Sequence, residues 1–174
     1  MQLTRIMERF ILHWGEMGTR WGVNRSVAQI HALLYLAPEP LPAEEIADTL
    51  GMARSNVSNS LKELQNWELV QVTHALGDRR DHFHAEQDIW EILRVIVDGR
   101  KRREIDPTLS VLREFAAGAS ADTDTPADVK ARIVSMLEFL EELSTWYEQI
   151  RQMPRTALMK LMRLGVRIRK LNAG

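Results

Sequence analysis

The sequence predicts a mostly α-helical fold with one small β-hairpin, on three observations. Apolar residues recur every three or four positions through most of the 174 residues, as they do on the buried face of a helix. The period changes to alternation in LVQVTH, residues 69–74, and a turn, ALGDRRD, leads to a short returning strand at residues 82–85. Apolar residues make up 45% of the chain and charged residues 27%, which favours a folded globular protein over a disordered one.

Composition argues against several classes of protein. No run of about 18 apolar residues occurs, and the charged N-terminus lacks the features of a secretion signal, so we expect a cytoplasmic protein without a membrane segment. Cysteine is absent, which excludes disulfides and thiolate metal sites. The chain has no P-loop, no nucleotide-binding glycine run, no metalloprotease His-Glu pair and no nucleophile elbow. We therefore expect no enzyme, no catalytic residue and no cofactor.

Four helices are predicted before the hairpin, and the first three have simple boundaries. The first ends near residue 14 and is followed by a glycine-rich link, GEMGTRWGVN, at residues 15–24. Ser26 can cap a second helix, which the prolines of PEPLP at residues 38–42 stop. Pro42 suits the first position of a short third helix.

A fourth helix, predicted at residues 53–67, has two unlike faces. With a turn of about 100° per residue, its apolar side chains fall within a narrow arc: Val57, Leu61 and Leu64. The opposite face carries small polar groups and one cation: Ser55, Ser58, Asn59 and Lys62. Ser and Asn are indifferent helix formers, so their outward position suggests another use. Such a face suits a DNA major groove, where Asn pairs with adenine edges and Ser with several bases.

The residues around this helix predict a winged helix-turn-helix. Ala47, Gly51 and Val57 have the required spacing: the alanine lets two helices cross closely, the glycine turns the chain and the valine fills the crossing. The hairpin would be the wing, and its tip can place Arg79 or Arg80 in a minor groove. We assign this DNA-binding domain to residues 26–87.

The flanking segments, residues 1–25 and 88–174, are expected to form a helical dimerisation region, the second with a possible effector site. A helix from residue 88 should run through the basic residues 100–103 to about residue 105, and Pro107 should open another. The small-residue loop GASADTDTP, residues 118–126, is the best candidate for an internal boundary.

Residues 127–152 are predicted to form one long helix with an apolar heptad pattern. The pattern comprises Val129, Ile133, Met136, Leu140, Leu143, Tyr147 and Ile150. Two interpretations stay open: the helix packs within a bundle of its own chain, or it pairs with the same helix of a second copy. The basic tail after Pro154 is interpreted as a solvated face.

A family resemblance is visible in the run RSVAQIHALLYLAPEPLPAEEIADTLGMARSNVSNSLKELQNWELVQ and the later GDRRDHFHAEQDIWEILR. Over about residues 1–115 the chain resembles the GbsR-type regulators, a branch of the MarR-like winged-helix repressors. The resemblance implies a bacterial, homodimeric transcription factor, a repressor, that binds a double-stranded DNA operator. It matches Asp78 and Arg80 to the wing, where the acid braces the arginine. The positions it matches to the recognition helix are Arg54, Ser55, Asn56, Ser58, Asn59 and Lys62.

Members of this type often regulate choline uptake or glycine betaine synthesis, and some sense those compounds, so the resemblance implies a quaternary ammonium effector. Such a ligand binds in an aromatic cage. The candidate residues are Trp21, Trp67, Trp90, Trp146 and Tyr147. Each ring alone is more typical of a packed core.

Two alternatives bear on the predicted site. His74, His82 and His84 could bind a metal, but a wing that grips DNA is a poor place for one, and exposed or hydrogen-bonded histidines are commoner, so no metal is predicted. The second alternative is a winged-helix adaptor that binds protein and not DNA. Residues 41–85 contain four basic and seven acidic residues, and this acidic balance supports the adaptor. For the segment to bind DNA, Glu44, Glu45 and Asp48 must point away from phosphate.

Overall fold

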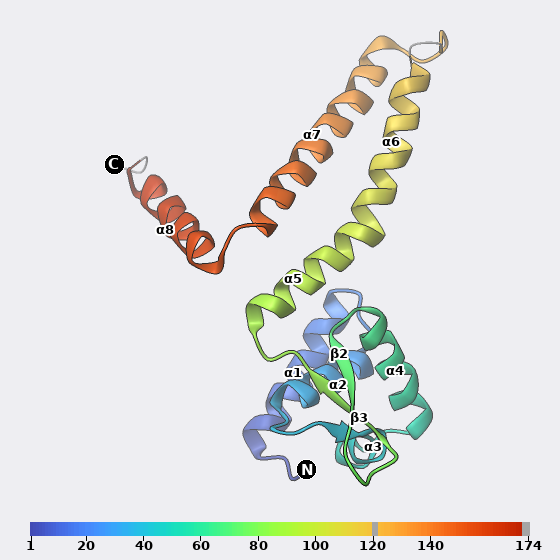
Figure 1. Cartoon of the computed structure of the whole chain (residues 1–174). Helices are drawn as coiled ribbons and strands as arrows, with labels where there is room; N and C mark the ends of the chain where they lie inside the picture. Colours follow the sequence, from blue (N-terminus) through green and yellow to red (C-terminus); the bar gives the residue numbers. More distant parts are fainter. Residues whose placement is uncertain (120–121, 172–174) are drawn as a thin grey trace. The chain divides into compact units, whose positions relative to one another are not determined.

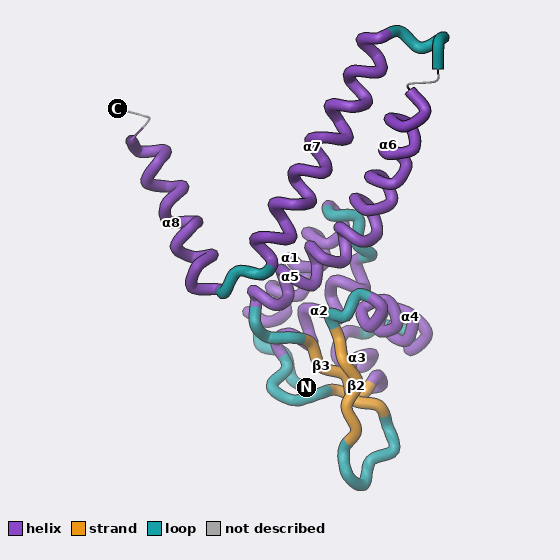
Figure 2. Tube along the Cα trace, turned by 45° about the horizontal axis from the view of Figure 1, so that its top comes forward, coloured by secondary structure: helices purple, strands orange, loops and turns teal. Residues whose placement is uncertain are grey.

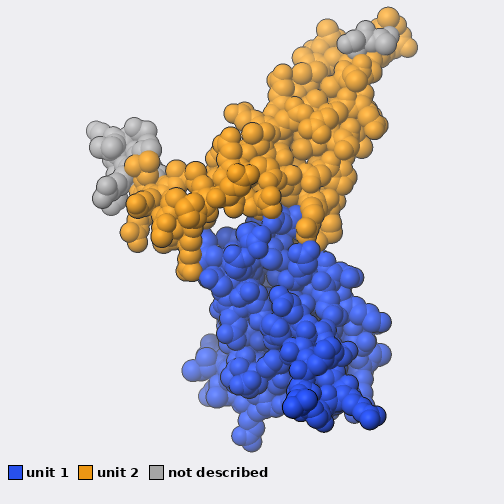
Figure 3. All heavy atoms as spheres, viewed as in Figure 1, with its two compact units in different colours: residues 1–99 blue, residues 100–174 orange. Residues whose placement is uncertain are grey.

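The computed structural model describes residues 1–119 and 122–171, with side chains as far as residue 164. The described chain is mostly helical, with one small antiparallel sheet, so the predicted fold class is confirmed. It divides into two compact units, Met1–Gly99 and Arg100–Gly174, coloured separately in Figure 3. Each unit is described by itself.

The first unit contains five helices and all three strands described (Figure 1). Their bounds are α1 Arg5–Arg20, α2 Arg25–Leu36, β1 Leu41–Pro42, α3 Ala43–Leu50, α4 Arg54–Asn66, β2 Val70–His74, β3 Asp81–Ala85 and α5 Ile89–Arg100.

The prediction of a glycine-rich link after residue 14 is wrong, because α1 continues to Arg20. Gly15 and Gly18 are buried in that helix, where α1 packs against α2. A Cβ on Gly18 would lie 2.5 Å from Cβ of Ala28, and one on Gly15 would lie 2.7 Å from Cγ of Gln29. The glycines therefore allow two helices to approach closely, and they do not loosen the chain.

The predicted Ser26 cap of α2 is also wrong. The side chain of Asn24 is the cap, because its Oδ1 accepts a hydrogen bond from the backbone N–H of Ser26 at 2.8 Å. Asn is among the best residues for this position, since its short side chain reaches the first N–H groups of the helix. The hydroxyl of Ser26 instead accepts a hydrogen bond from the side chain of Asn56.

The sheet has the order β1-β3-β2, and only β2 and β3 were predicted. The hairpin register runs from Val70 opposite Ala85 to His74 opposite Asp81, and its turn projects beyond the sheet (Figure 2). The missed strand β1 pairs Pro42 with His82 at the edge of the sheet, where a residue without an N–H is tolerated. Pro42 consequently caps α3, which begins at Ala43 and not at the proline.

The core of this unit lies between α2, α3, α4 and the sheet. Ile30, Leu33, Ile46 and Leu61 are each at most 2% exposed. Burial of one such side chain contributes about 1.5–3 kcal/mol. The apolar arc predicted for α4 is confirmed, because its three residues all belong to this core.

The second unit contains η1, a π-helical stretch at Lys101–Ile105, followed by α6 Asp106–Ala119, α7 Ala127–Arg151 and α8 Arg155–Leu171. The helix predicted to open at Pro107 is confirmed within one residue, since α6 begins at Asp106 and the proline lies in its first turn, where a missing N–H is tolerated. Helices α6 and α7 pack together, and Arg113 Nε donates to Glu141 Oε1 at 2.8 Å between them. The loop before α7 is therefore not the internal boundary, which falls after Gly99.

Every residue of helix α7 is at least partly exposed in the described chain. A stripe of large apolar side chains at heptad spacing is exposed: Met136 58%, Phe139 62%, Leu143 41% and Trp146 54%. Of the predicted heptad pattern, Met136 and Leu143 are exposed, whereas the other members are half-buried: Val129, Ile133, Leu140, Tyr147 and Ile150. Within residues 1–119 and 122–171, no helix has the length and apolar character needed to cross a membrane.

Candidate nucleic-acid interface

Helices α3 and α4 form the predicted helix-turn-helix. Gly51 ends α3 with φ of +62°, a left-handed conformation that glycine adopts without strain. The backbone N–H of Met52 then donates a hydrogen bond to the carbonyl oxygen of Ala47 at 2.9 Å. Ala47 and Val57 are buried at the crossing, 3% and 0% exposed. The predicted roles of these small residues are confirmed.

The polar face of α4 is open to solvent. All six side chains predicted to contact DNA from this helix are exposed: Arg54, Ser55, Asn56, Ser58, Asn59 and Lys62. They lie opposite a fully buried apolar arc, so the helix is fixed by one side and exposed on the other. Contacts of these six residues with DNA stay a prediction.

Asn56 differs from the other five because its amide is already engaged. Its Nδ2 donates to Oγ of Ser26 at 3.0 Å, and its Oδ1 accepts from the buried Ser60 at 3.5 Å. The pair Asn56–Ser26 joins α4 to the start of α2. Sequence reasoning missed this role of Ser26, because the partners are 30 residues apart.

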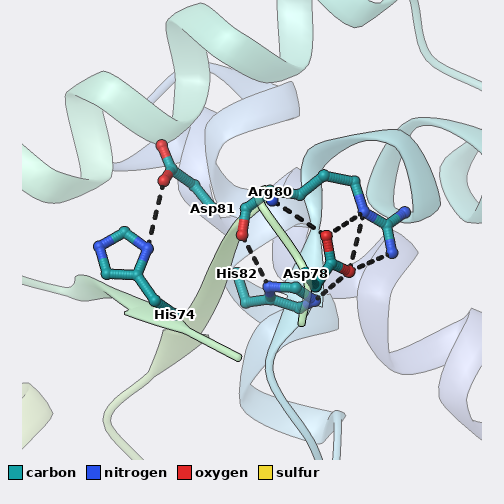
Figure 4. A network of polar contacts seen from close by, with 5 residues as sticks. All are labelled: His74, Asp78, Arg80, Asp81 and His82. Atoms are coloured by element: carbon teal, nitrogen blue, oxygen red, sulfur yellow. Dashed lines mark hydrogen bonds and ion pairs between the residues drawn. The ribbon is translucent and has the colours of Figure 1, made fainter. Parts of the chain in front are cut away.

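The wing contains a bracket between Asp78 and Arg80 (Figure 4). The backbone N–H and Nε of Arg80 donate to Asp78 Oδ1 at 3.0 Å, and Nη2 donates to Oδ2 at 2.5 Å. These hydrogen bonds hold the pKa of Asp78 well below its usual range and raise that of Arg80. Arg80 remains 55% exposed, and its neighbour Arg79 is exposed too. The acid thus braces the arginine, as the resemblance implied.

The histidines of the hairpin have separate carboxylate partners. His82 Nε2 lies 3.6 Å from Asp78 Oδ2, and His74 Nδ1 lies 3.6 Å from Asp81 Oδ1. His84 is half-buried further along β3. No group of three potential ligands with metal-binding geometry occurs in the part of the chain that the structure describes.

Acidic residues lie near the wing. Glu44 and Glu45, at the start of α3, act electrostatically on Arg80 and contribute to its raised pKa. Glu45 Oε1 also pairs with the N-terminal ammonium group of Met1 at 2.5 Å. The charge of the wing arginine is therefore partly offset from within the chain.

The aromatic candidates for an effector site come from four different helices or their ends. Trp21 follows α1 and Trp67 follows α4, whereas Trp90 lies in the first turn of α5. Trp146 and Tyr147 lie in α7 of the second unit. In the first unit Phe10 stacks on Trp14 and on Tyr35, with ring centroids 5.5 Å and 6.3 Å apart. An aromatic cage stays a prediction.

Comparison with known proteins agrees with this geometry. Residues 21–81, which span the winged helix except its last strand, match the MarR family. The winged helix of this chain is therefore MarR-like. The recognition of a MarR-like winged helix from sequence is thereby confirmed.

The similarity of the MarR-like chain to individual proteins extends further. It is 23% identical over 136 residues to the HTH-type transcriptional repressor GbsR of Bacillus subtilis strain 168, covering 76% of this chain and 75% of the relative. It is 19% identical to the putative HTH-type transcriptional regulator YvaV of the same organism, covering 81% and 79%. A crystal structure of a transcriptional regulator has a TM-score of 0.61 at 19% identity, covering 91% of this chain and 99% of that one. The structural likeness supports the fold of most of the chain.

Proposed function

We propose that this chain is a sequence-specific DNA-binding transcriptional repressor of the GbsR type, which acts as a homodimer. The observation that carries the proposal is the open polar face of α4 beside a braced arginine, on a winged helix of the MarR family. Two similar proteins of Bacillus subtilis bear the name repressor, GbsR and OpcR, which supports the same function here.

In this proposal α4 reads a major groove. Asn59 can pair bidentately with an adenine, and the serines near it can contact several bases. Lys62 and Arg54 supply positive charge for phosphate. Asn56 keeps its bond to Ser26 and holds the start of α2 beside the reading helix.

The wing would place Arg80 in the neighbouring minor groove. Narrow minor grooves carry an enhanced negative potential that attracts arginine. Asp78 occupies two of the five guanidinium N–H groups, and the rest of the exposed guanidinium is available to acceptors on DNA.

The homodimer is supported by the second unit. The exposed stripe of α7 contains two aromatic rings and a methionine, the residue types enriched at protein interfaces. Dimerisation would also compensate for the acidic excess of residues 41–85, because two copies engage the operator at once. Two recognition helices would then enter major grooves about 34 Å apart.

A quaternary ammonium effector, choline or glycine betaine, belongs to the proposal through the family resemblance and the aromatic candidates named from the sequence. Binding would favour one separation of the two recognition helices and so change operator affinity. Calorimetric titration of the full chain with choline and with glycine betaine tests this: saturable heat at millimolar ligand or below supports it, and no heat with either compound removes it.

Selection of duplexes from a random-sequence library, followed by gel shifts, tests DNA binding. Recovery of a consistent motif is expected, with a half-site repeat of about 10–11 base pairs or a multiple, a spacing set by the DNA helix. Asn59→Ala should weaken binding by about 10-fold, since one bidentate base contact contributes about 1–3 kcal/mol. The matched control is Asn66→Ala, an exposed asparagine at the end of the same helix, which should bind normally.

An adaptor that binds protein is the second candidate, and the position of Glu44 and Glu45 near the wing arginine favours it. Salt separates the two functions, because DNA affinity falls steeply with salt as counterions are released. If no motif is enriched and any retained DNA is insensitive to salt, the adaptor is the better assignment.

A further inference from the structure

The imidazole of His82 lies against the Asp78–Arg80 bracket and touches both of its residues (Figure 4). Its Nδ1 is 3.0 Å from the carbonyl oxygen of Arg80, and its Nε2 is 3.6 Å from Oδ2 of Asp78. The side chain is 13% exposed, whereas that of Arg80 is 55% exposed. His82 is held in the middle strand of the sheet, opposite Thr73 on one side and Pro42 on the other.

The two neighbours of this ring are both acceptors. A backbone carbonyl can only accept a hydrogen bond, so Nδ1 must carry a hydrogen to bind it. The carboxylate of Asp78 is ionised, because Arg80 holds its pKa low, and it too can only accept. A neutral imidazole has one N–H, so the neutral ring would present a lone pair to one of the two oxygens. The doubly protonated ring donates to the carbonyl and also places its positive charge 3.6 Å from the carboxylate of Asp78.

We propose that His82 is a positioning residue of the wing, which in its doubly protonated form holds Asp78 and thereby fixes the guanidinium of Arg80 for DNA. This inference rests on the proposed function, in which Arg80 contacts the minor groove. DNA binding would then be coupled to proton uptake at His82, and affinity would rise as the pH falls through the range of about 8 to 5, in which imidazoles change charge.

Other charged groups near the Asp78–Arg80 pair compete for the arginine, and a cation at His82 would oppose that competition. Glu44 and Glu45 attract the guanidinium of Arg80 from α3, in competition with Asp78. A cation at His82 fixes the carboxylate of Asp78, so that Arg80 stays on the wing. His74 and Asp81 form a separate pair on the same hairpin, with Nδ1 and Oδ1 also 3.6 Å apart. Among the described residues, no hydrogen bond or ion pair joins this pair to Arg80.

The pH dependence of DNA binding tests the proposal. The probe is a duplex that the full chain selects from a random-sequence library, and its dissociation constant is measured at pH 8 and pH 6 at constant ionic strength. The unaltered protein should bind about three- to fivefold more tightly at pH 6, the effect expected of one partly exposed ion pair. His82→Gln should remove most of that response. His74→Gln is the matched control and should keep it.

A double-mutant cycle separates positioning from direct contact. In an Arg80→Ala background, His82→Gln should cause no further loss, because its effect passes through the arginine. An equal loss in both backgrounds would mean that His82 acts independently of Arg80, which overturns the positioning role. A pH response unchanged by His82→Gln overturns it as well.

A measurement without DNA distinguishes failure of this inference from failure of the proposed function. Long-range ¹H–¹⁵N spectra of the unaltered protein at pH 6 should show hydrogen on both ring nitrogens of His82. One N–H at that pH disproves the doubly protonated form of His82 even if the chain binds DNA and the variant is unstable. Two N–H groups in a chain that selects no duplex would leave the doubly protonated form of His82 intact and overturn the DNA-binding function, and the positioning role with it.

Discussion

Helices α4 and α7 are both amphipathic, and they differ in which face the chain itself covers. The apolar residues of α4 are buried, with Val57 at 0% and Leu61 at 2% exposure, so only its polar face meets solvent. In α7 every residue is at least partly exposed, and Phe139 and Trp146 are more than half exposed. The apolar face of α4 is already covered by its own chain, and its polar face is available to a ligand. Helix α7 retains exposed apolar surface of the kind that association with another chain would cover.

The largest effect is expected from truncation of the covered face. Leu61→Ala should lower the free energy of unfolding of the first unit by about 2–5 kcal/mol, since it removes buried methyl groups and leaves a cavity. Phe139→Ala is the matched control from α7, and it should change that free energy by less than about 0.5 kcal/mol, as surface substitutions do. Urea unfolding followed by the signal of the first unit checks both. Equal losses would mean that α7 is covered after all.

The loss of stability of the first unit at low pH should be nearly as large as the loss caused by Leu61→Ala. His31 is 5% exposed and burial lowers its pKa from 6.5 to about 4; its Nε2 has no hydrogen-bond partner among the described residues. As the pH falls below 6.5 the unfolded chain takes up a proton that the folded chain does not, so stability is lost between about pH 6.5 and pH 4. The loss amounts to about 3 kcal/mol at the lower end.

His31→Leu should flatten this dependence, because it removes the titrating ring from the core. Denaturant unfolding at pH 7 and pH 4.5 measures the difference. His13→Leu is the control, since that histidine is exposed in α1 and should leave the acid response as it was. A core whose stability is equal at both pH values in the unaltered protein contradicts the prediction.

The uncovered face of α7 should matter for association. Phe139→Glu places a charge in the exposed apolar stripe and should weaken homodimerisation by at least about 10-fold, because burying an uncompensated charge costs more than about 1.4 kcal/mol. Thr145→Glu puts the same charge on an exposed polar position on the other side of the helix and should have little effect. Sedimentation velocity over a concentration series measures both. Dimers that tolerate Phe139→Glu must use another surface.

Features with a local signature could be predicted from the sequence, whereas features that depend on contacts between distant residues could not. Periodicity placed α4 within one residue at each end, since its apolar arc, Gly51 and the hairpin each have a local signature. Strand β1 could not be predicted, because two residues carry no alternation and become a strand only by pairing with β3. The contacts Asn56–Ser26 and His82–Asp78 were missed for a similar reason: each depends on how the folded chain brings side chains together. The Asp78–Arg80 bracket was expected through the family resemblance.

The last two predictions concern glycines, and their effects on stability have opposite signs. Gly18 faces Ala28 across the contact of α1 with α2, so Gly18→Ala should cost about 1–3 kcal/mol by overpacking. Gly118 lies in α6, and an added Cβ there would have no described neighbour within 4 Å, so Gly118→Ala should gain up to about 1 kcal/mol from helix propensity alone. Thermal unfolding of the two variants measures the difference. Stabilisation by Gly18→Ala would show that the two helices do not approach as closely as the structure has them, and that residues 15–20 behave as the loose link first expected from the sequence.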